Sequence, residues 1–305
     1  MKTLVLSMIS IAATVAAMTA CTSESDEVDN VIDAPVEVQL NAGINNISVK
    51  SDGIQTPDAN NFDANIIVST KTNIYGTSIW TGADAGKINV VSNAVTFNTK
   101  QAYPSDASAI FMKAYAPFEG NYGSDKVEFT IDGNKDIMVS NEVTGSKSDN
   151  ENKKLTFAHK LAQLNFNVIA KDEAAQKAWG KINGIKVEAI TNLDLTLSSG
   201  ELVAHSEAVN SEISTIGFTA ITELPVSPTS AAAAGYVMVL PKAEAYTVII
   251  ESEKGPANKQ ITLTTPIKTV ESTAYNITLT FNSTEVIVTS EVGEWKTEVG
   301  SGSVD

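Results

Sequence analysis

Residues 164–168 read Leu-Asn-Phe-Asn-Val, and this alternation of apolar and polar side chains decides the class of fold. Successive side chains of a β-strand point to opposite faces, so a period of two marks a strand with one buried face. The same period or a short apolar run, with turn residues between, recurs at 36–40, 66–70, 110–114, 127–131, 193–197, 236–240, 246–250, 261–264, 277–281 and 286–289. Many short strands at such spacing predict an all-β protein built of β-sandwiches.

Helical signals are scarce by comparison. Residues 171–179 (KDEAAQKAW), followed by Gly180, are the best candidate for a short helix. The alanine-rich stretch 230–235 predicts a loop, with a single helical turn as the alternative. The polar run 146–154 is either a linker between two domains or a long hairpin loop inside one, and both readings stay open.

Asp132 begins a stretch that copies part of a calcium-binding loop. Such a loop would need a glycine where Ile137 stands and a glutamate where Val143 stands. Asp132-Gly133 is instead a strong hairpin signal. We therefore expect a hairpin that joins strands at 127–131 and 137–139, and no metal site.

The composition excludes several classes of protein. The length of 305 residues suggests roughly two domains. All 21 basic residues are lysines and the net charge is −15, so nucleic acid and anionic lipid would be repelled. A single cysteine cannot form an internal disulfide or a cysteine zinc site. Because there is neither a GxSxG motif nor a glycine-rich phosphate loop, nothing argues for an enzyme, and we expect no cofactor.

The first twenty residues predict an export signal rather than part of the fold. Lys2 precedes an apolar run at 4–17, and Met18-Thr19-Ala20 leads into Cys21. This pattern resembles a bacterial lipobox, so residues 1–20 are expected to be removed and Cys21 to carry the lipid. An ordinary secretory signal is the alternative. Residues 21–34 are acidic and should form a flexible tether, or an export signal of surface lipoproteins.

Four segments resemble the fimbrillin family, the pilin-like surface lipoproteins of Bacteroides-type bacteria. They read LTFAHKLAQLNFNV at 155–168, FMKAYAP at 111–117, GYVMVLP at 235–241, and a tail from Tyr275 through 286–288 to Trp295. The resemblance implies two transthyretin-like β-sandwich domains, which we place at 35–152 and 153–305. It also implies a type V pilus subunit that assembles by strand exchange after a protease removes the first strand.

Each part of that assembly mechanism has a candidate in this chain. Val36, Val38 and Leu40 would form the N-terminal strand that fills the groove, and the C-terminal donor strand would carry Val286, Val288, Val292 and Trp295. Lys50, in a loop open to cleavage, takes the place of the family's usual arginine. Alternatively, Lys50 is an ordinary loop lysine and the subunit is an uncut anchor held by its lipid.

The resulting hypothesis is a non-enzymatic, structural subunit of a cell-surface fimbria (pilus) that supports adhesion or biofilm formation. Its expected partners are other fimbrial subunits, the outer membrane through acyl chains such as palmitate on Cys21, a maturation protease and a surface receptor, but not nucleic acid. The alternative is a monomeric surface lipoprotein that stacks glycans on Trp80, Tyr75 and Tyr122. A hydrolase with converging carboxylates ranks last.

Overall fold

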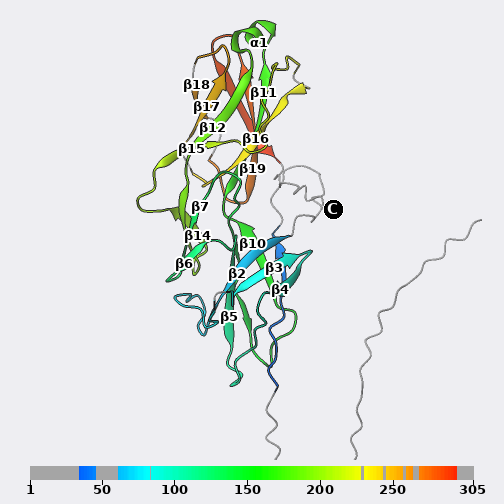
Figure 1. Ribbon diagram of the computed structural model, residues 1–305, viewed down its shortest axis with the longest axis vertical. Helices are drawn as coiled ribbons and strands as arrows, with labels where there is room; N and C mark the ends of the chain where they lie inside the picture. Colours follow the sequence, from blue (N-terminus) through cyan, green and yellow to red (C-terminus); the bar gives the residue numbers. More distant parts are fainter. Residues whose placement is uncertain are drawn as a thin grey trace, which may run out of the picture. The chain divides into compact units, whose positions relative to one another are not determined.

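Strands make up nearly all of the regular structure. The computed structural model describes residues 34–45, 61–82, 84–227, 230–242, 245–256, 259–263 and 268–293 (Figure 1). Within these ranges there is one α-helix, α1 (Glu173–Trp179). The prediction of an all-β fold with sandwich-like sheets and little helix is confirmed.

The first sheet has eight strands and closes on itself. Its members are β1 (Asn41–Ile44), β2 (Phe62–Ser69), β3 (Lys87–Val91), β4 (Ala94–Phe97), β5 (Ile110–Ala116), β8 (Met138–Ser140), β9 (Val143–Gly145) and β10 (Lys154–His159). Their order is β2-β3-β4-β1-β10-β8-β5-β9, and five further pairs join β2 to β5. This pairing turns seven of the strands into a partial barrel. Its interior is filled by apolar side chains such as Ile66, Ile88, Met112, Leu155 and Phe157.

The second and third sheets form a sandwich around one core. One sheet has the order β16 (Ala232–Val239), β11 (Ala162–Ala170), β19 (Thr273–Phe281), β20 (Val286–Gly293). The other has the order β15 (Asn210–Ser214), β12 (Ile182–Ile190), β17 (Tyr246–Ser252), β18 (Lys259–Leu263). Buried side chains from both sheets belong to one cluster, including Leu164, Phe166 and Ile277 from the first and Val187 and Val248 from the second. The alternating patterns at 164–168 and 277–281 therefore supply the inner face of this sandwich.

The helix α1 lies beside this second core, at the predicted place. Its N-cap is Asp172, whose carboxylate accepts a hydrogen bond from the backbone N–H of Ala175 at 2.8 Å. It ends at Gly180, which has a positive φ of 65°. Trp179 is buried edge-on against Phe281, with 5.0 Å between ring centroids, and its Nε1 donates to the carbonyl of Asn282. The helix is thereby fixed to the end of β19.

A fourth sheet combines strands from distant parts of the sequence. Its order is β14 (Glu201–Ala204), β13 (Asn192–Thr196), β7 (Lys126–Thr130), β6 (Asn121–Gly123). A third apolar cluster lies behind it and includes Val127, Phe129, Leu193 and Leu195. The proposed division at residue 152 stays a prediction. Any boundary must accommodate the pairing of β13 with β7 and of β10 with β1 and β8.

The hairpin predicted at Asp132-Gly133 is wrong. β7 pairs with β6 and β13, whereas β8 pairs with β5 and β10. The Asp132 carboxylate accepts backbone N–H groups of Asn134 and Lys135, each at 3.0 Å, so the turn is real but local. The pairing of β7 with β13 is decided by burial, because Phe129 lies opposite Leu193 and Val127 opposite Leu195.

The loop predicted at 230–235 is also wrong over most of its length. β16 begins at Ala232, and Ala232 and Ala233 pair with Val168 and Asn167 across a β-bulge. Gly235 has a φ of 82°, and a Cβ there would lie 2.4 Å from the carbonyl oxygen of Ile216. Small side chains at this point allow close backbone approach, which outweighs the weak strand propensity of alanine.

Candidate functional site

The N-terminal segment 35–44 is an integral part of the first sheet. The backbone N–H of Val38 donates to the carbonyl of Gln101 at 2.8 Å, and the N–H of Tyr103 donates to the carbonyl of Val36 at 3.0 Å. Glu37 and Ala102 form an antiparallel bridge between these two bonds. The predicted strand at 36–40 is therefore extended and paired, although the continuous strand β1 begins only at Asn41.

β1 fills the position between β4 and β10 (Figure 1). It makes four parallel pairs with β10 and a single antiparallel pair with β4, between Asn41 and Ala94. The backbone N–H of Asn41 donates to the carbonyl of Lys153 at 2.8 Å, and that of Ala42 to the carbonyl of Asn93 at 2.9 Å. Taking β1 away would leave unpaired backbone groups on both β4 and β10, which is a template for another strand.

The side chains of this segment alternate as a groove-filling strand requires. Val38, Leu40 and Ala42 are buried in the core of the first sheet, and Val36 packs partly against it. Glu37 and Gln39 point to solvent, and Glu37 forms an exposed ion pair with Lys100 at 2.9 Å. A surface hollow of about 830 Å³ borders the segment and is bounded on its far sides by residues 94–97 and 150–153. The apolar contacts hold the segment, because the exposed ion pair adds little.

The C-terminal candidate β20 is bound differently. It is an edge strand with eight antiparallel pairs to β19. Val286 and Val288 pack partly against the core of the sandwich, whereas Val292 is 43% exposed. Ile287, on the other face of the strand, is 47% exposed. The structure thus places three of the four predicted donor residues in the chain's own sheet, and Trp295 lies outside the described residues.

Two further predicted positions, Cys21 and Lys50, also lie outside the described residues. Lys50 nevertheless falls between the end of β1 at Ile44 and the start of β2 at Phe62. A cut there would leave the described N-terminal segment held to the rest of the chain by noncovalent contacts alone. The connectivity of the fold is therefore compatible with release of this strand.

The aromatic residues of the glycan-binding alternative do not form a shared platform. Tyr75 is fully buried, and its hydroxyl donates to the Glu142 carboxylate. Tyr122 is half-buried and donates to the carbonyl of Tyr75. Trp80 packs edge-on against Phe97 at 5.8 Å between ring centroids, beside the core of the first sheet. Each ring thus has a structural role.

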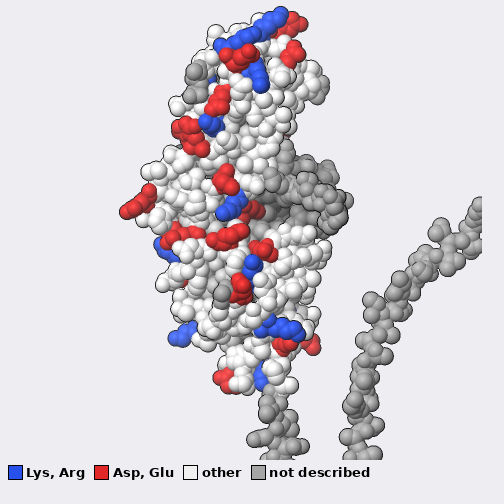
Figure 2. All heavy atoms as spheres, in the orientation of Figure 1, with Lys and Arg blue, Asp and Glu red and all other residues white. Residues whose placement is uncertain are grey.

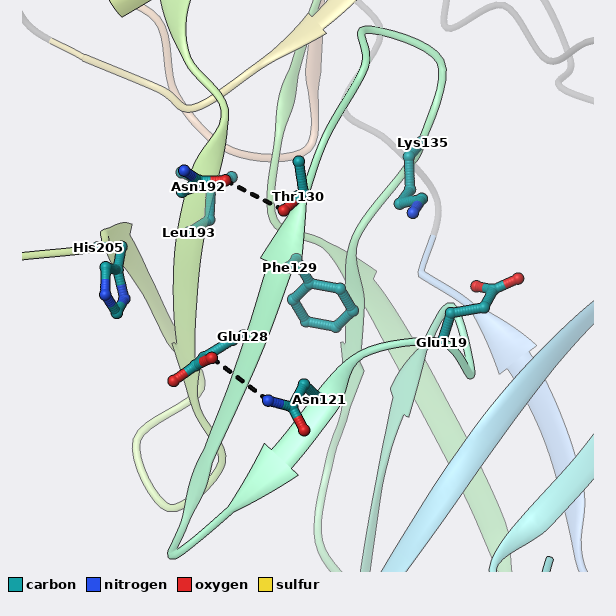
Figure 3. Close-up of a pocket in the computed structure, with 9 residues that line it drawn as sticks. All are labelled: Glu119, Asn121, Glu128, Phe129, Thr130, Lys135, Asn192, Leu193 and His205. Carbon is teal, nitrogen blue, oxygen red and sulfur yellow. Dashed lines mark hydrogen bonds between the residues drawn. The ribbon is translucent and has the colours of Figure 1, made fainter. Parts of the chain in front are cut away.

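The two histidines each pair with a carboxylate. His159 is buried, and its Nδ1 lies 2.5 Å from Asp136 Oδ2. His205 is half-exposed, and its Nδ1 lies 2.7 Å from Asp194 Oδ1. Ligand atoms of Glu128, Asp194 and His205 lie within 4.8 Å of one another. Glu128 and His205 also line a second hollow of about 410 Å³ (Figure 3). Sequence reasoning missed this cluster, because its members stand far apart in the chain and form no short motif.

The surface agrees with the acidic composition. On the face shown in Figure 2, carboxylates and lysines are interspersed, and the described residues there gather no basic patch. Among the described residues, no helix is long and apolar enough to span a bilayer.

Comparisons with known proteins agree with this architecture. Residues 36–295 match the family model described as fimbrillin-like. No protein with a curated description matches the chain.

Several solved structures share the fold. A cell adhesion candidate from Bacteroides ovatus has 15% sequence identity and a TM-score of 0.56, covering 87% of this chain and 99% of its own. A similar candidate from Bacteroides uniformis has 16% identity and a TM-score of 0.53, covering 86% and 99%. A fimbrial protein from Bacteroides vulgatus has 14% identity and a TM-score of 0.50, covering 85% and 99%. At such identities the likeness concerns the fold alone.

Proposed function

The chain belongs to the fimbrillin-like family, and we propose that it joins its neighbours in a cell-surface fimbria by exchange of a β-strand. A fimbrial subunit has a structural rather than a catalytic task, and its partners are other subunits. The observation that supports strand exchange is the place of β1, which fills a position between β4 and β10 in an otherwise continuous sheet. Its buried side chains and its paired backbone would both have to be replaced if it left.

The sequence of events begins with the lipid. Acyl chains on Cys21 hold the precursor in the outer membrane, because two or more chains bury enough methylene groups for stable anchoring. The acidic tether at 21–34 separates the lipid from the folded body. A protease then cuts after Lys50, and the segment that contains Val36, Val38 and Leu40 is released. The opened slot presents unpaired backbone groups and an apolar floor to the next subunit.

The C-terminal strand of a neighbour would fill this slot. Val286, Val288 and Val292 lie at positions of the same parity, as the buried residues Val38, Leu40 and Ala42 do. β20 is an edge strand, so it can leave β19 without dividing the sheet in which it lies. Burial of the three valines in the slot, at about 1.5–3 kcal/mol each, would offset their partial burial against β19.

A single cleavage experiment tests the proposal. The purified chain is treated with a lysine-specific protease, and its molecular mass is followed by light scattering after size-exclusion chromatography. The Lys50→Ala chain is the matched control, because it keeps every other lysine. We expect the cut chain to form polymers and the control to stay monomeric. A cut chain that loses its N-terminal segment and stays monomeric would contradict strand exchange.

Two further measurements separate the parts of the proposal. A chain that ends at Asn282 should be cut normally but should not polymerise, since it lacks the donor strand. Mass spectrometry of protein extracted from the cell surface should find acyl chains on Cys21 and a new N-terminus at Ser51. Acylation together with an intact Lys50–Ser51 bond would identify an uncut anchor instead. Adhesion and biofilm formation would then be compared between cells that carry unaltered and Lys50→Ala chains.

A further inference from the structure

Three side chains with metal-binding groups meet on the fourth sheet. Glu128 on β7 lies directly opposite Asp194 on β13. His205 follows β14, and its backbone N–H donates to the carbonyl of Asn192 at 2.9 Å, which continues the pairing of β14 with β13. Each residue offers one ligand atom, and these atoms lie within 4.8 Å of one another. Three adjacent strands thus bring one imidazole and two carboxylates together.

We propose that Glu128, Asp194 and His205 form a binding site for Zn²⁺ or a similar first-row divalent cation. Imidazole nitrogen and carboxylate oxygen are both ordinary zinc ligands, and three protein ligands leave a fourth place for water. One nitrogen and few oxygens suit Ca²⁺ poorly, because that ion takes six to eight oxygen ligands.

The electrostatics of the cluster favour a cation. Like charges directly opposite each other on paired strands are destabilising. Asp194 is only 6% exposed, so water screens its charge poorly. Lys126 is a cation close to Asp194, with its Nζ 3.4 Å from Asp194 Oδ2 and its side chain 57% exposed.

The geometry needs only small movements to hold the ion. Metal–ligand bonds of about 2.0–2.2 Å place tetrahedral ligand atoms about 3.4 Å apart. The ion would replace the proton between His205 Nδ1 and Asp194 Oδ1, so these two atoms would part by about 0.7 Å from their present 2.7 Å. Glu128 is exposed, and the hydrogen bond that its carboxylate accepts from the side-chain amide of Asn121 is long, at 3.4 Å. Its carboxylate is therefore free to turn toward the ion.

Access to the site is open. Figure 3 shows Glu128 and His205 among the residues that line the hollow of about 410 Å³. Glu128 is on β7 and His205 follows β14, with β13 between these two strands. The other histidine–aspartate pair, His159 with Asp136, is a useful contrast. It is buried, and among the described residues no third ligand joins it. The proposal therefore concerns His205 alone of the two histidines.

A bound ion would join segments that are far apart in the sequence. β7 and the β13–β14 hairpin meet through strand pairing, through the cluster behind the sheet, and through side-chain contacts such as the hydrogen bond of 3.0 Å from Thr130 Oγ1 to Asn192 Oδ1. An ion held by both segments binds the folded state and not the unfolded one, so it should raise the unfolding temperature as its concentration rises.

The test titrates ZnCl₂ into the purified full chain by calorimetry. CoCl₂, whose visible absorption reports the ligands, is used in a parallel experiment. Glu128→Gln and His205→Gln each remove one ligand at an exposed or half-exposed position, which keeps the risk to folding low. Glu212→Gln is the matched control, because it removes an equal charge from an exposed residue of another sheet. Lys126→Gln removes the competing cation.

We expect one zinc ion per chain, an affinity at least about tenfold weaker in both ligand variants, and no change in Glu212→Gln. Lys126→Gln should bind more tightly. The cobalt spectrum and the zinc-dependent rise in unfolding temperature should both be lost in Glu128→Gln. Zinc binding that is absent, or equal in the unaltered chain and both ligand variants, would overturn the proposal. So would a clear preference for Ca²⁺ over Zn²⁺.

Discussion

The two end segments of the described chain, 35–44 and β20, are both β-structure at a sheet, but they are held in different ways. The N-terminal segment lies inside its sheet, with partners on both sides and three buried apolar side chains. β20 lies at an edge, with one partner, two half-buried valines and two apolar side chains that are more than 40% exposed. Loss of the N-terminal segment opens the first sheet between β4 and β10. Loss of β20 leaves its sheet intact, with β19 as the new edge strand.

This difference indicates that the N-terminal segment is suited to be replaced by another strand, whereas β20 is suited to be donated to another subunit. A slot between two strands selects its occupant by backbone pairing on both sides and by the alternation of its side chains. An edge strand costs its own sheet less when it leaves. The same asymmetry predicts that substitutions or deletions at the N-terminal segment will reduce the free energy of unfolding more than those at β20.

The largest effect should come from deleting each end. A chain that begins at Ser51 loses Val38 and Leu40 from the core, at about 1.5–3 kcal/mol each, so its free energy of unfolding should fall by about 3–6 kcal/mol. A chain that ends at Asn282 should lose about 1–3 kcal/mol, since its valines are only half-buried. Urea unfolding followed by circular dichroism measures both, and a chain that begins at Asp33 is the control. Equal losses of unfolding free energy for the two deletions would contradict the difference proposed between the two end segments.

Single substitutions should also reduce the free energy of unfolding more at the N-terminal segment than at β20, by smaller amounts than the deletions. Leu40→Ala leaves a cavity in the core of the first sheet and should cost about 2–4 kcal/mol. Val288→Ala, at the edge strand, should cost about 1 kcal/mol. Gln39→Ala changes an exposed neighbour of Leu40 and should stay within about 0.5 kcal/mol of the unaltered chain. A Val288→Ala cost that matches or exceeds that of Leu40→Ala would contradict the account.

A smaller effect than that of Leu40→Ala concerns how the stability of the first sheet depends on pH. The Glu142 carboxylate accepts hydrogen bonds from Tyr75, from Thr72 Oγ1 at 2.7 Å and from the backbone N–H of Asn73 at 2.7 Å. Burial alone would raise the pKa of Glu142, but these hydrogen bonds outweigh it and lower the pKa below its usual value. Because the folded pKa is the lower one, this stabilisation is present above the unfolded pKa. It is lost as the pH falls through the folded pKa.

Glu142→Gln should therefore reduce the free energy of unfolding by about 1–2 kcal/mol at pH 7 and by much less at pH 3. Urea unfolding at both pH values measures the difference. Glu119→Gln is a control, since Glu119 is exposed. A Glu142→Gln cost that is the same at pH 3 and pH 7 would show that the carboxylate charge is not responsible.

The strands could be predicted where apolar and polar side chains alternate, although in β11 the polar residues Gln163 and Asn165 are buried as well. The periods at 164–168 and 277–281 became β11 and β19, and the helix at 171–179 has the expected cap and end. The pairing of strands could not be predicted in the same way. Asp132-Gly133 forms a local turn, but β7 pairs with the preceding β6 and with β13, a strand more than sixty residues away that is chosen by matching buried faces.

The same limit applies to the candidate sites, because local patterns can be read from the sequence and contacts between distant strands cannot. The alternation of Val36, Val38 and Leu40 could be read from the sequence, because it is a local pattern. Its position between β4 and β10 could not, since that depends on contacts with distant strands. Glu128, Asp194 and His205 lie in three separate segments, and only the register of three paired strands brings them together.

The central claim is that the slot left by the N-terminal segment accepts the C-terminal strand of a neighbour. Binding of a fluorescent peptide of residues 284–298 to a chain that spans residues 51–282 tests it most directly, because this chain has the slot but neither natural occupant. We predict saturable binding that an unlabelled peptide of residues 34–45 abolishes and a scrambled peptide does not. Absence of binding, or binding that the 34–45 peptide leaves unchanged, would contradict the claim.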